Sequence, residues 1–600
     1  MTDGGAVPDG HRRRPWAVLS RRRAPWTLPL VIIAVIAAVA VVDHLGARRI
    51  SPVDQTPVTA LAPAPGGTAA VHLDEPWAGF NPSTPEGAAS STPVLLDQVL
   101  PSAYTFNAKQ VAQVNADLLE SVEVTSTAPL TIVYTLNPKA TWSDGIPVSA
   151  DDFIYAWMAQ RGNGTDVDGK PDRVASTLGY RDIRSVTGTK GGQVVTVVFA
   201  TPFADWRILF DHMVPSHIGD TVGWNTAFAT FNPAVEVAAG PFRLVSVGPD
   251  GTAVLQRNPR WWGTPAPLAQ LTVTGGPTVV GSGVPGPTVP VPSVHGAIQS
   301  GQFGLTDLAR ITAHPDVQSS LHPSLGLVSL EFAVRSPVTG VPAVRQALAH
   351  LIDRAALTTA VLGTLDPSIP VNDDHLAVAS QVGYVASSAA GEYQQAEPEA
   401  AARLLRSAGY VRDGAGPWTG PGGAPLTVRM AVEAGDPWLG EAAYGIVAEL
   451  AGAGVRVVVT PVDGTPGLRA AQAAAAYDLA LVHRTASPFL SVTQGWYAPA
   501  PPHAGPADQQ NWSGFDDPQV EQLFDKAAQV LNPVTAQAVY SQIDDQLWDQ
   551  MVALPLFGLP GLVASGVQLS GPTYNATVDG LLWNAGLWSR LAPPKTAARR

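Results

Sequence analysis

The chain has 600 residues with 36 basic and 49 acidic side chains, a formal net charge of −13, and no cysteine. That length exceeds what a single hydrophobic core organises, so we expect several domains. The absence of cysteine excludes disulfide bonds, thiolate metal sites, a cysteine nucleophile and a lipid-modified cysteine.

The charge is distributed unevenly along the chain. Residues 1–49 hold eight arginines and three aspartates, which leaves 28 basic and 46 acidic side chains, a net charge of −18, on the remainder. A body that acidic repels polyanions, so we expect no nucleic-acid partner.

The N-terminal region predicts a membrane anchor. Residues 1–25 form a basic tail, residues 26–43 are almost wholly apolar, and residues 44–70 are a Pro/Ala-rich tether. Arginines upstream of an apolar span place the N-terminus in the cytoplasm and the bulk of the chain outside, in a single-pass signal-anchor. Ala38-Val39-Ala40 has the small-x-small form of a cleavage site, so a cleaved and secreted form is the alternative.

The first clear structural unit of the body is a strand, a turn and a capped helix. Residues 130–136 alternate between apolar and smaller or polar side chains, the period of a half-buried strand. Asp144-Gly145 supplies turn chemistry. Ser149 precedes Asp152 by three residues, the spacing of a capping box at a helix start.

Further elements follow in alternation. We expect a helix over residues 202–213, a hairpin turn at residues 249–251 and a helix over residues 341–363 that begins at Pro342. Strands over residues 426–432 and 455–459 flank a helix over residues 439–451, and this pattern is typical of an α/β fold.

Several of these segments resemble one protein family. Asn137-Pro138 and residues 142–153 (WSDGIPVSADDF) are similar to the signature of extracellular solute-binding proteins of family 5, the oligopeptide-, dipeptide- and nickel-binding proteins of ABC importers. Residues 344–354 and Asn511-Trp512-Ser513-Gly514-Phe515 resemble later family segments, in family order. The chain most resembles an actinobacterial subgroup, some members of which are linked to cell-envelope mannolipid synthesis.

The resemblance implies an α/β, two-lobe, periplasmic-binding-protein-like (class II) clamshell with an additional inserted domain, which closes on its ligand by hinge motion. On this chain, lobe I would comprise residues 71–110, 235–325 and 550–600. The inserted domain would be residues 111–234 and lobe II residues 326–549.

The charged pair Asp353-Arg354 lies in one of the family-like segments. Adjacent opposite charges on a helix could suggest a catalytic dyad, but they more often form a solvated or capping pair, which is the role expected here.

The resemblance also implies ligand contacts in lobe II. In peptide-binding members, an aspartate shortly after the segment that matches Asp478-Leu479 pairs with the amino terminus of the peptide. Residues 482–490 contain no carboxylate and offer His483 and Arg484 instead. A cation there favours a neutral or anionic ligand, such as a phosphorylated glycolipid head. The alternative is that Arg484 faces solvent.

Aromatic side chains complete the candidate ligand contacts. Trp496, Tyr497 and Trp512 follow in lobe II, and Tyr104, Phe106 and Asn107 come from a first-lobe segment that runs along the cleft in the family. Aromatic faces suit sugar or acyl ligands. Each aromatic residue alone has a core role as its alternative.

No catalytic motif accompanies these features. The sequence has no P-loop, no G-x-S-x-G, no H-E-x-x-H and no regular histidine set, so we expect no catalytic residue, no metal and no cofactor. We therefore expect a monomeric, membrane-anchored solute-binding protein of an ABC-type importer, which binds a peptide-like or other small amphiphilic ligand and contacts the permease. One alternative is a non-transport relative that binds an envelope glycolipid or regulates mannolipid synthesis. Another is an extracytoplasmic hydrolase, because a carboxylate pair is compatible with the sequence.

Overall fold

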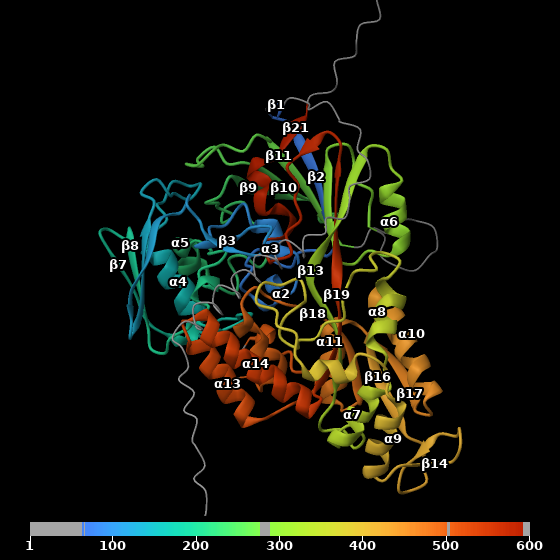
Figure 1. The fold of residues 1–600 in the computed structure, drawn as a ribbon. Helices are drawn as coiled ribbons and strands as arrows, with labels where there is room; N and C mark the ends of the chain where they lie inside the picture. The colour runs from blue at the N-terminus through green and yellow to red at the C-terminus, as the bar shows by residue number, and fades with distance from the viewer. Residues whose placement is uncertain (1–62, 65, 277–288, 501–504, 592–600) are drawn as a thin grey trace, which may run out of the picture. The chain divides into compact units, whose positions relative to one another are not determined.

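The computed structural model describes residues 63–64, 66–276, 289–500 and 505–591 (Figure 1). The predicted basic tail and membrane span therefore lie outside the described residues, as does most of the tether. Within the ranges described, no helix is long and apolar enough to cross a bilayer.

A ten-stranded mixed sheet runs through the molecule in the order β17-β16-β18-β13-β19-β12-β2-β11-β10-β9. In that order its strands are Arg456–Val462, Thr427–Glu433, Leu479–Thr485, Val317–Phe332, Ala553–Gly566, Gly296–Ser300, Thr68–Leu73, Gln270–Gly275, Ala253–Arg257 and Phe242–Val247. The hairpin turn predicted at residues 249–251 lies between β9 and β10, as expected.

Two long antiparallel strands, β13 and β19, connect the two halves of this sheet. Residues 317–323 of β13 pair with residues 560–566 of β19, and residues 327–331 pair with residues 553–558. β12 joins β19 in the first half, whereas β18 joins β13 in the second. Figure 1 shows both strands running from one half into the other. The register shifts between Pro323 and Leu327, where the two halves meet.

A separate four-stranded sheet has the order β5-β6-β8-β7, from Leu119–Thr127, Leu130–Leu136, Val194–Phe199 and Ile183–Thr189. The side chains of β6 alternate between buried and half-buried, as predicted. Helix α4 (Ala150–Gln160) packs on β7, and its capping box forms: Ser149 Oγ accepts from Asp151 N and Asp152 Oδ2 accepts from Ser149 N.

Helices surround the second half of the large sheet: α7 (Pro342–His350), α8 (Arg354–Leu362), α9 (Pro398–Ser407), α10 (Pro437–Gly452), α13 (Pro518–Gln529) and α14 (Pro533–Gln550). The predicted helix over residues 341–363 is thus two helices. Asp353 separates them, because its carboxylate accepts from Ala356 N and caps α8. Five of the six begin with proline at the first or second position, where the missing N–H costs least.

The predicted helix over residues 202–213 is wrong. Only Trp206–Ile208 forms a short 3₁₀ turn. Phe210 and His212 have φ angles of +59° and +43°, which lie outside the right-handed helical region. Tertiary packing determines the conformation here, since Trp206 and Phe210 are both buried within the same cluster of apolar side chains.

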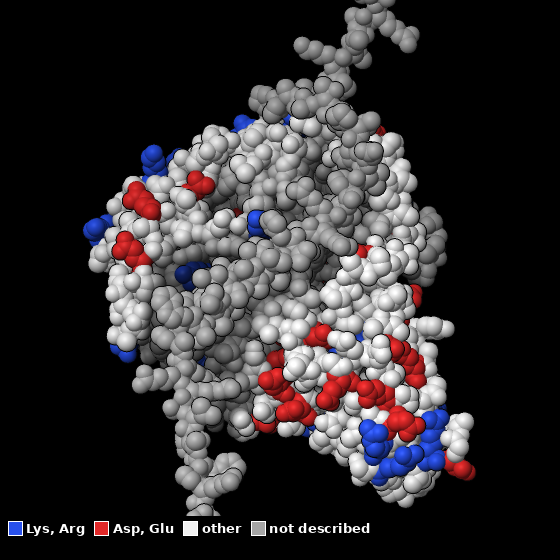
Figure 2. Space-filling view, viewed as in Figure 1, with Lys and Arg blue, Asp and Glu red and all other residues white. Residues whose placement is uncertain are grey.

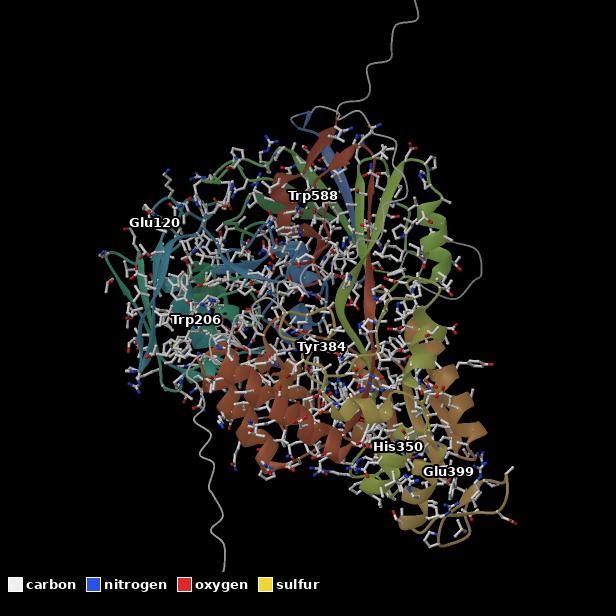
Figure 3. The ribbon with its side chains drawn as sticks, viewed as in Figure 1. Glu120, Trp206, His350, Tyr384, Glu399 and Trp588 are labelled. Atoms are coloured by element: carbon white, nitrogen blue, oxygen red, sulfur yellow. The ribbon has the colours of Figure 1, made fainter. Side chains whose placement is uncertain are left out.

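Buried apolar residues form four clusters, numbered here as the first to fourth cores. The first draws almost entirely on residues 69–273 and 563–588, and Figure 3 labels Trp206 and Trp588 within it. The second, third and fourth draw on residues 289–564. The first core joins residues predicted for lobe I with residues predicted for the inserted domain, and the predicted boundaries between them stay a prediction.

Acidic side chains gather on one part of the surface. Figure 2 shows Asp and Glu concentrated over the lower centre of its view, near α14, and Lys and Arg gathered beside them at the lower right, where α9 lies. Glu399, Asp545 and Asp549 on these helices are exposed.

The sequence predicts that the pair Asp353-Arg354 is solvated or capping: Asp353 does cap α8, whereas Arg354 is wholly buried and not solvated. Its guanidinium donates to the backbone carbonyls of Asn372, Ala390, Tyr393 and Pro555 and to Asp373 Oδ1. Five donors in a planar fork allow one side chain to hold several loops against β19. The family-like motif therefore has a structural role at this position.

Replacing Arg354 tests this role. Arg354→Met keeps much of the volume but leaves four carbonyls and Asp373 without their donor, so we expect a loss of about 3–5 kcal/mol of unfolding free energy. Urea unfolding followed by tryptophan fluorescence measures it. Arg403→Met, at an exposed position of α9, is the matched control. A loss no larger than that of the control would contradict the role.

Candidate functional site

Arg484 lies on β18 and faces Glu331 of the neighbouring strand β13. The Arg484 Nε and Nη2 atoms each lie 3.1 Å from Glu331 Oε1, and the two side chains are 1% and 0% exposed. Because Glu331 pairs across the ladder with Ala480 and Arg484 with Leu327, the arginine reaches along the strand to meet the carboxylate. Arg484 Nη1 also donates to the Gln510 carbonyl.

This pair changes the sequence-based argument about the ligand. The prediction used Arg484 as a ligand-binding cation in a segment without a carboxylate, and the alternative placed it in solvent. The structure contradicts the alternative, since Arg484 is buried, and it supplies a carboxylate partner, Glu331, from the neighbouring strand. A charge already paired in the interior gives no reason to favour an anionic ligand.

His483 points to the opposite face of β18, because successive side chains alternate along a strand. Its Nδ1 lies 3.4 Å from Asp436 Oδ2. Burial alone would raise the pKa of Asp436, but hydrogen bonds from His483 and from the Leu439 and Trp438 N–H groups outweigh it and hold that pKa below its ordinary value. His483 is therefore paired as well, and the structure separates it from Arg484.

Trp496 and Tyr497, in helix α12 (Gln494–Tyr497), pack on Arg484. The guanidinium carbon lies 4.9 Å from the Trp496 ring centroid and 5.4 Å from that of Tyr497. Both rings belong to the third core and are 2% and 0% exposed. The structure thus brings these three predicted residues together, although as interior groups in this conformation.

Tyr104 and Phe106 lie in β3 (Tyr104–Phe106), which pairs with β4 (Ala112–Val114). The Phe106 N–H donates to Asp579 Oδ2 at 2.6 Å and its carbonyl accepts from Asn575 Nδ2 at 2.9 Å. The peptide groups of Phe106 are therefore already bonded within the protein. Its ring meets Phe489 edge to face, with centroids 5.8 Å apart.

The remaining predicted residues have local roles. The Asn107 side chain accepts from the Lys109 and Val111 N–H groups and closes the turn after β3. Trp512 belongs to the fourth core, and its carbonyl accepts from the Tyr477 hydroxyl. Ligand contact by any of the eight predicted residues stays a prediction.

Sequence reasoning missed Glu331 and Phe489, which contact predicted residues directly. Glu331 is the only charge in residues 325–332, a strand segment that is otherwise uncharged and fully buried. A lone carboxylate in such a segment requires a buried partner, and this signal could have identified it. Phe489 carried no comparable signal, since its contact with Phe106 depends on how the cores meet.

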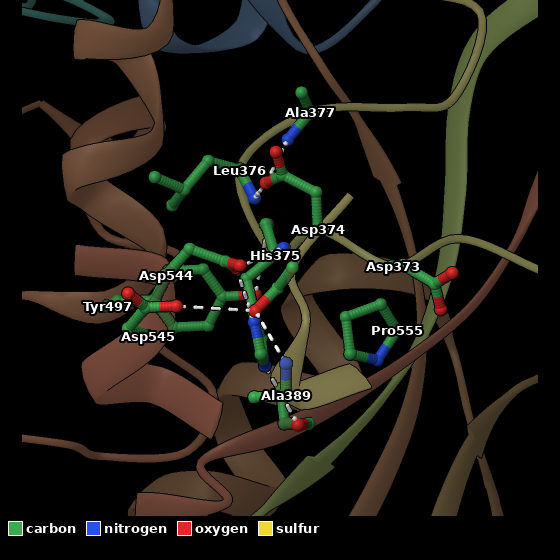
Figure 4. Close-up of polar contacts among 12 residues, drawn as sticks. Asp373, Asp374, His375, Leu376, Ala377, Ala389, Tyr497, Asp544, Asp545 and Pro555 are labelled. Carbon is green, nitrogen blue, oxygen red and sulfur yellow. Dashed lines mark hydrogen bonds and ion pairs between the residues drawn. The ribbon is translucent and has the colours of Figure 1, made fainter. Parts of the chain in front are cut away.

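A second buried polar cluster, next to Tyr497, contains Asp374, His375 and Asp544 (Figure 4). His375 Nδ1 lies 2.7 Å from Asp544 Oδ1, and the Tyr497 hydroxyl donates to the His375 carbonyl. Asp374 accepts from the Leu376 and Ala377 N–H groups. Burial, together with the nearby Asp544 carboxylate, raises the pKa of Asp374 to about 7.

The described part of the chain contains no group of three or more His, Asp or Glu side chains placed to hold a metal ion.

Comparisons with known proteins fit this architecture. Residues 113–502, well over half of the chain, match the sequence model described as bacterial extracellular solute-binding proteins, family 5 Middle. The oligopeptide-binding protein OppA of Mycobacterium tuberculosis is 27% identical over 531 residues, which cover 86% of this chain and 84% of that protein.

A second relative matches a shorter segment of the chain, and a solved structure has a similar fold. The probable monoacyl phosphatidylinositol tetramannoside-binding protein LpqW of the same species is 28% identical over 346 residues, 56% of this chain and 51% of that protein. The solved structure of the periplasmic EDTA-binding protein EppA is similar with a TM-score of 0.78 at 22% identity, over 91% of this chain and 100% of that one. The predicted α/β fold of the two-lobe periplasmic-binding type is thereby confirmed.

The Glu331–Arg484 pair can be tested by a double-mutant cycle. Arg484→Met or Glu331→Met alone leaves one buried charge unpaired, so we expect each to cost about 3–5 kcal/mol of unfolding free energy. The double variant should lose less than the sum of the two, because neither charge remains. The exposed pair Arg335–Asp516 provides the control cycle. Additive losses at Glu331 and Arg484 would contradict the coupling.

The raised pKa of Asp374 predicts a pH dependence of stability. Its pKa of about 7 in the folded state exceeds the value of about 3.9 in an unfolded chain, so its contribution is full below about pH 4 and is lost as pH rises through 7. We expect Asp374→Asn to flatten the fall in unfolding free energy between about pH 4 and pH 7. Asp545→Asn, at an exposed position of α14, should leave the slope unchanged. An unaltered slope in Asp374→Asn would show that the fall arises elsewhere.

Proposed function

Because the chain belongs to family 5 of the bacterial extracellular solute-binding proteins, we propose that it is the receptor of an ABC-type importer. It binds a peptide-like or other small amphiphilic ligand between its two lobes and releases that ligand chemically unchanged. The observation that carries this proposal is the family match over residues 113–502, together with the two-strand connection through β13 and β19.

The connection supports binding by closure. Two antiparallel strands that pass through both halves of a sheet keep the halves attached while allowing them to rotate relative to each other. The register shift near Pro323 is a natural place for such bending. OppA is named as an oligopeptide-binding protein, which supports a peptide-like ligand here.

One relative supports a second candidate function. LpqW is named as a probable binder of monoacyl phosphatidylinositol tetramannoside. The alternative is therefore a protein that binds an envelope glycolipid or regulates mannolipid synthesis without transport. The neutralisation of Arg484 by Glu331 removes the charge argument for a phosphorylated head group.

We assign the anchoring of the protein to residues 26–43. The family is described as extracellular, so the folded body acts outside the cytoplasm. The chain contains no cysteine to carry a lipid. The apolar stretch is then the element that holds a monomeric receptor next to its permease subunits.

Thermal unfolding of the full chain with candidate ligands tests the proposal. We expect a peptide pool to raise the unfolding temperature, since a ligand at 100 times its Kd stabilises by about 2.7 kcal/mol. Native mass spectrometry should recover the bound peptide with its mass unchanged. Stabilisation by phosphatidylinositol mannosides alone would favour the second function. Recovery of cleaved peptides would contradict binding without chemistry.

A further inference from the structure

The first and third cores meet along a seam. On one side lie residues 175–177 and 204–205, which adjoin the first core, and on the other lie residues 489–500 and 505–508, which adjoin the third. Backbone hydrogen bonds cross the seam from Ala507 N to the Ala175 carbonyl and from Ala204 N to the Ala528 carbonyl. Phe106 and Phe489 meet across it as well.

Two aspartate carboxylates, one from each side of the seam, accept hydrogen bonds from groups on the other side. Asp508, from the third-core side, accepts from Ser176 Oγ at 2.5 Å and from Thr177 N at 3.0 Å. Asp205, from the first-core side, accepts from Ser491 N at 3.2 Å. Hydrogen bonds to charged acceptors are stronger than neutral ones, so these contacts exceed the backbone bonds beside them in strength.

The segment that carries Asp508 is held firmly on its own side. The buried Arg484 donates to the Gln510 carbonyl, and Gln510 N donates to the Gly495 carbonyl. The position of Asp508 is therefore fixed before the seam closes, and little conformational entropy is lost in making its two hydrogen bonds.

Close approach across the seam also depends on Gly505. A Cβ atom added there would overlap the backbone carbonyl of Ala175. The absence of a side chain thus allows the two backbones to come close enough for the Asp508 carboxylate to reach Ser176 and Thr177.

We propose that Asp205, in the region predicted as the inserted domain, and Asp508, in the predicted lobe II, form a clasp that holds these two parts of the molecule closed and thereby slows the release of whatever the cleft contains. This inference rests on the proposed two-lobe binding function and adds to it the residues that control closure. Neither aspartate belongs to the family-like motifs, and neither was among the residues predicted from the sequence. Their role is to set the balance between closed and open forms.

The distance between two spin labels, one on each side of the seam, reports the balance between closed and open forms in the absence of a ligand. Because the chain has no cysteine, Arg184→Cys on β7 and Gln542→Cys on α14, both exposed, introduce two spin labels at defined places. Double electron–electron resonance on the full chain in detergent then gives the distance distribution. Asp205→Ala and Asp508→Ala should each raise the ratio of long to short distances about tenfold.

Two further variants keep the test decisive. Gly505→Ala should raise the ratio by steric contact with the Ala175 backbone, whether or not the aspartates hold the seam, and is therefore the positive control for the distance measurement. Asp545→Ala, on an exposed face of α14 away from the seam, should leave the distribution unchanged. Distances that stay the same in Asp205→Ala and Asp508→Ala but increase in Gly505→Ala would overturn the clasp.

The test of the clasp and the test of ligand binding can fail independently of each other. A peptide that binds while the aspartate variants show no change in distance would overturn the clasp and leave solute binding intact. A change in distance in a protein that binds none of the tested peptides or glycolipids would support the clasp and count against the proposed ligand classes.

Discussion

The pairing of β13 with β19 is the constraint on which the rest of the structure depends. Each strand contributes one end to each half of the ten-stranded sheet, so neither half has a complete set of strands without them. The hydrophobic cores on the two sides therefore pack against the same two strands, β13 and β19. This explains why residues 325–332 of β13 and residues 553–557 of β19 are all buried.

Within this frame, buried charges act mainly as connectors. Arg354 holds backbone carbonyls from several loops, and Arg345 does the same for the carbonyls of Thr339, Gln550 and Met551. Arg484 differs in using a carboxylate, Glu331, as its main partner. Interior guanidinium groups satisfied in these ways fix the relative positions of loops that hydrophobic packing alone would leave less specific.

The parts of the fold that could be predicted from the sequence are those decided by local chemistry. The alternation in β6 and the capping box at Ser149 depend on residues within a few positions of one another, and both formed as expected. The helix expected over residues 202–213 failed because burial of Trp206 and Phe210 outweighed local periodicity. The order of family-like segments revealed the fold class, since that information extends over most of the chain.

The candidate site was harder to predict for a physical reason. The partner of Arg484 lies 153 residues earlier in the chain, and no local pattern connects the two. Asp205, Phe489 and Asp508 become significant only where the cores meet. The sequence could therefore identify residues of the right chemical type near the site, but it could not tell which of their charges were already paired.

The hydrogen bonds that the Phe106 N–H and carbonyl groups already make within the protein have a consequence for ligand recognition. An extended chain lying against β3 would ordinarily be read through its main-chain amides. Here Asp579 and Asn575 already occupy those positions. A ligand that reached β3 would therefore meet the Phe106 ring, which is nearly buried against Phe489, and would find no free main-chain hydrogen-bonding group at this residue.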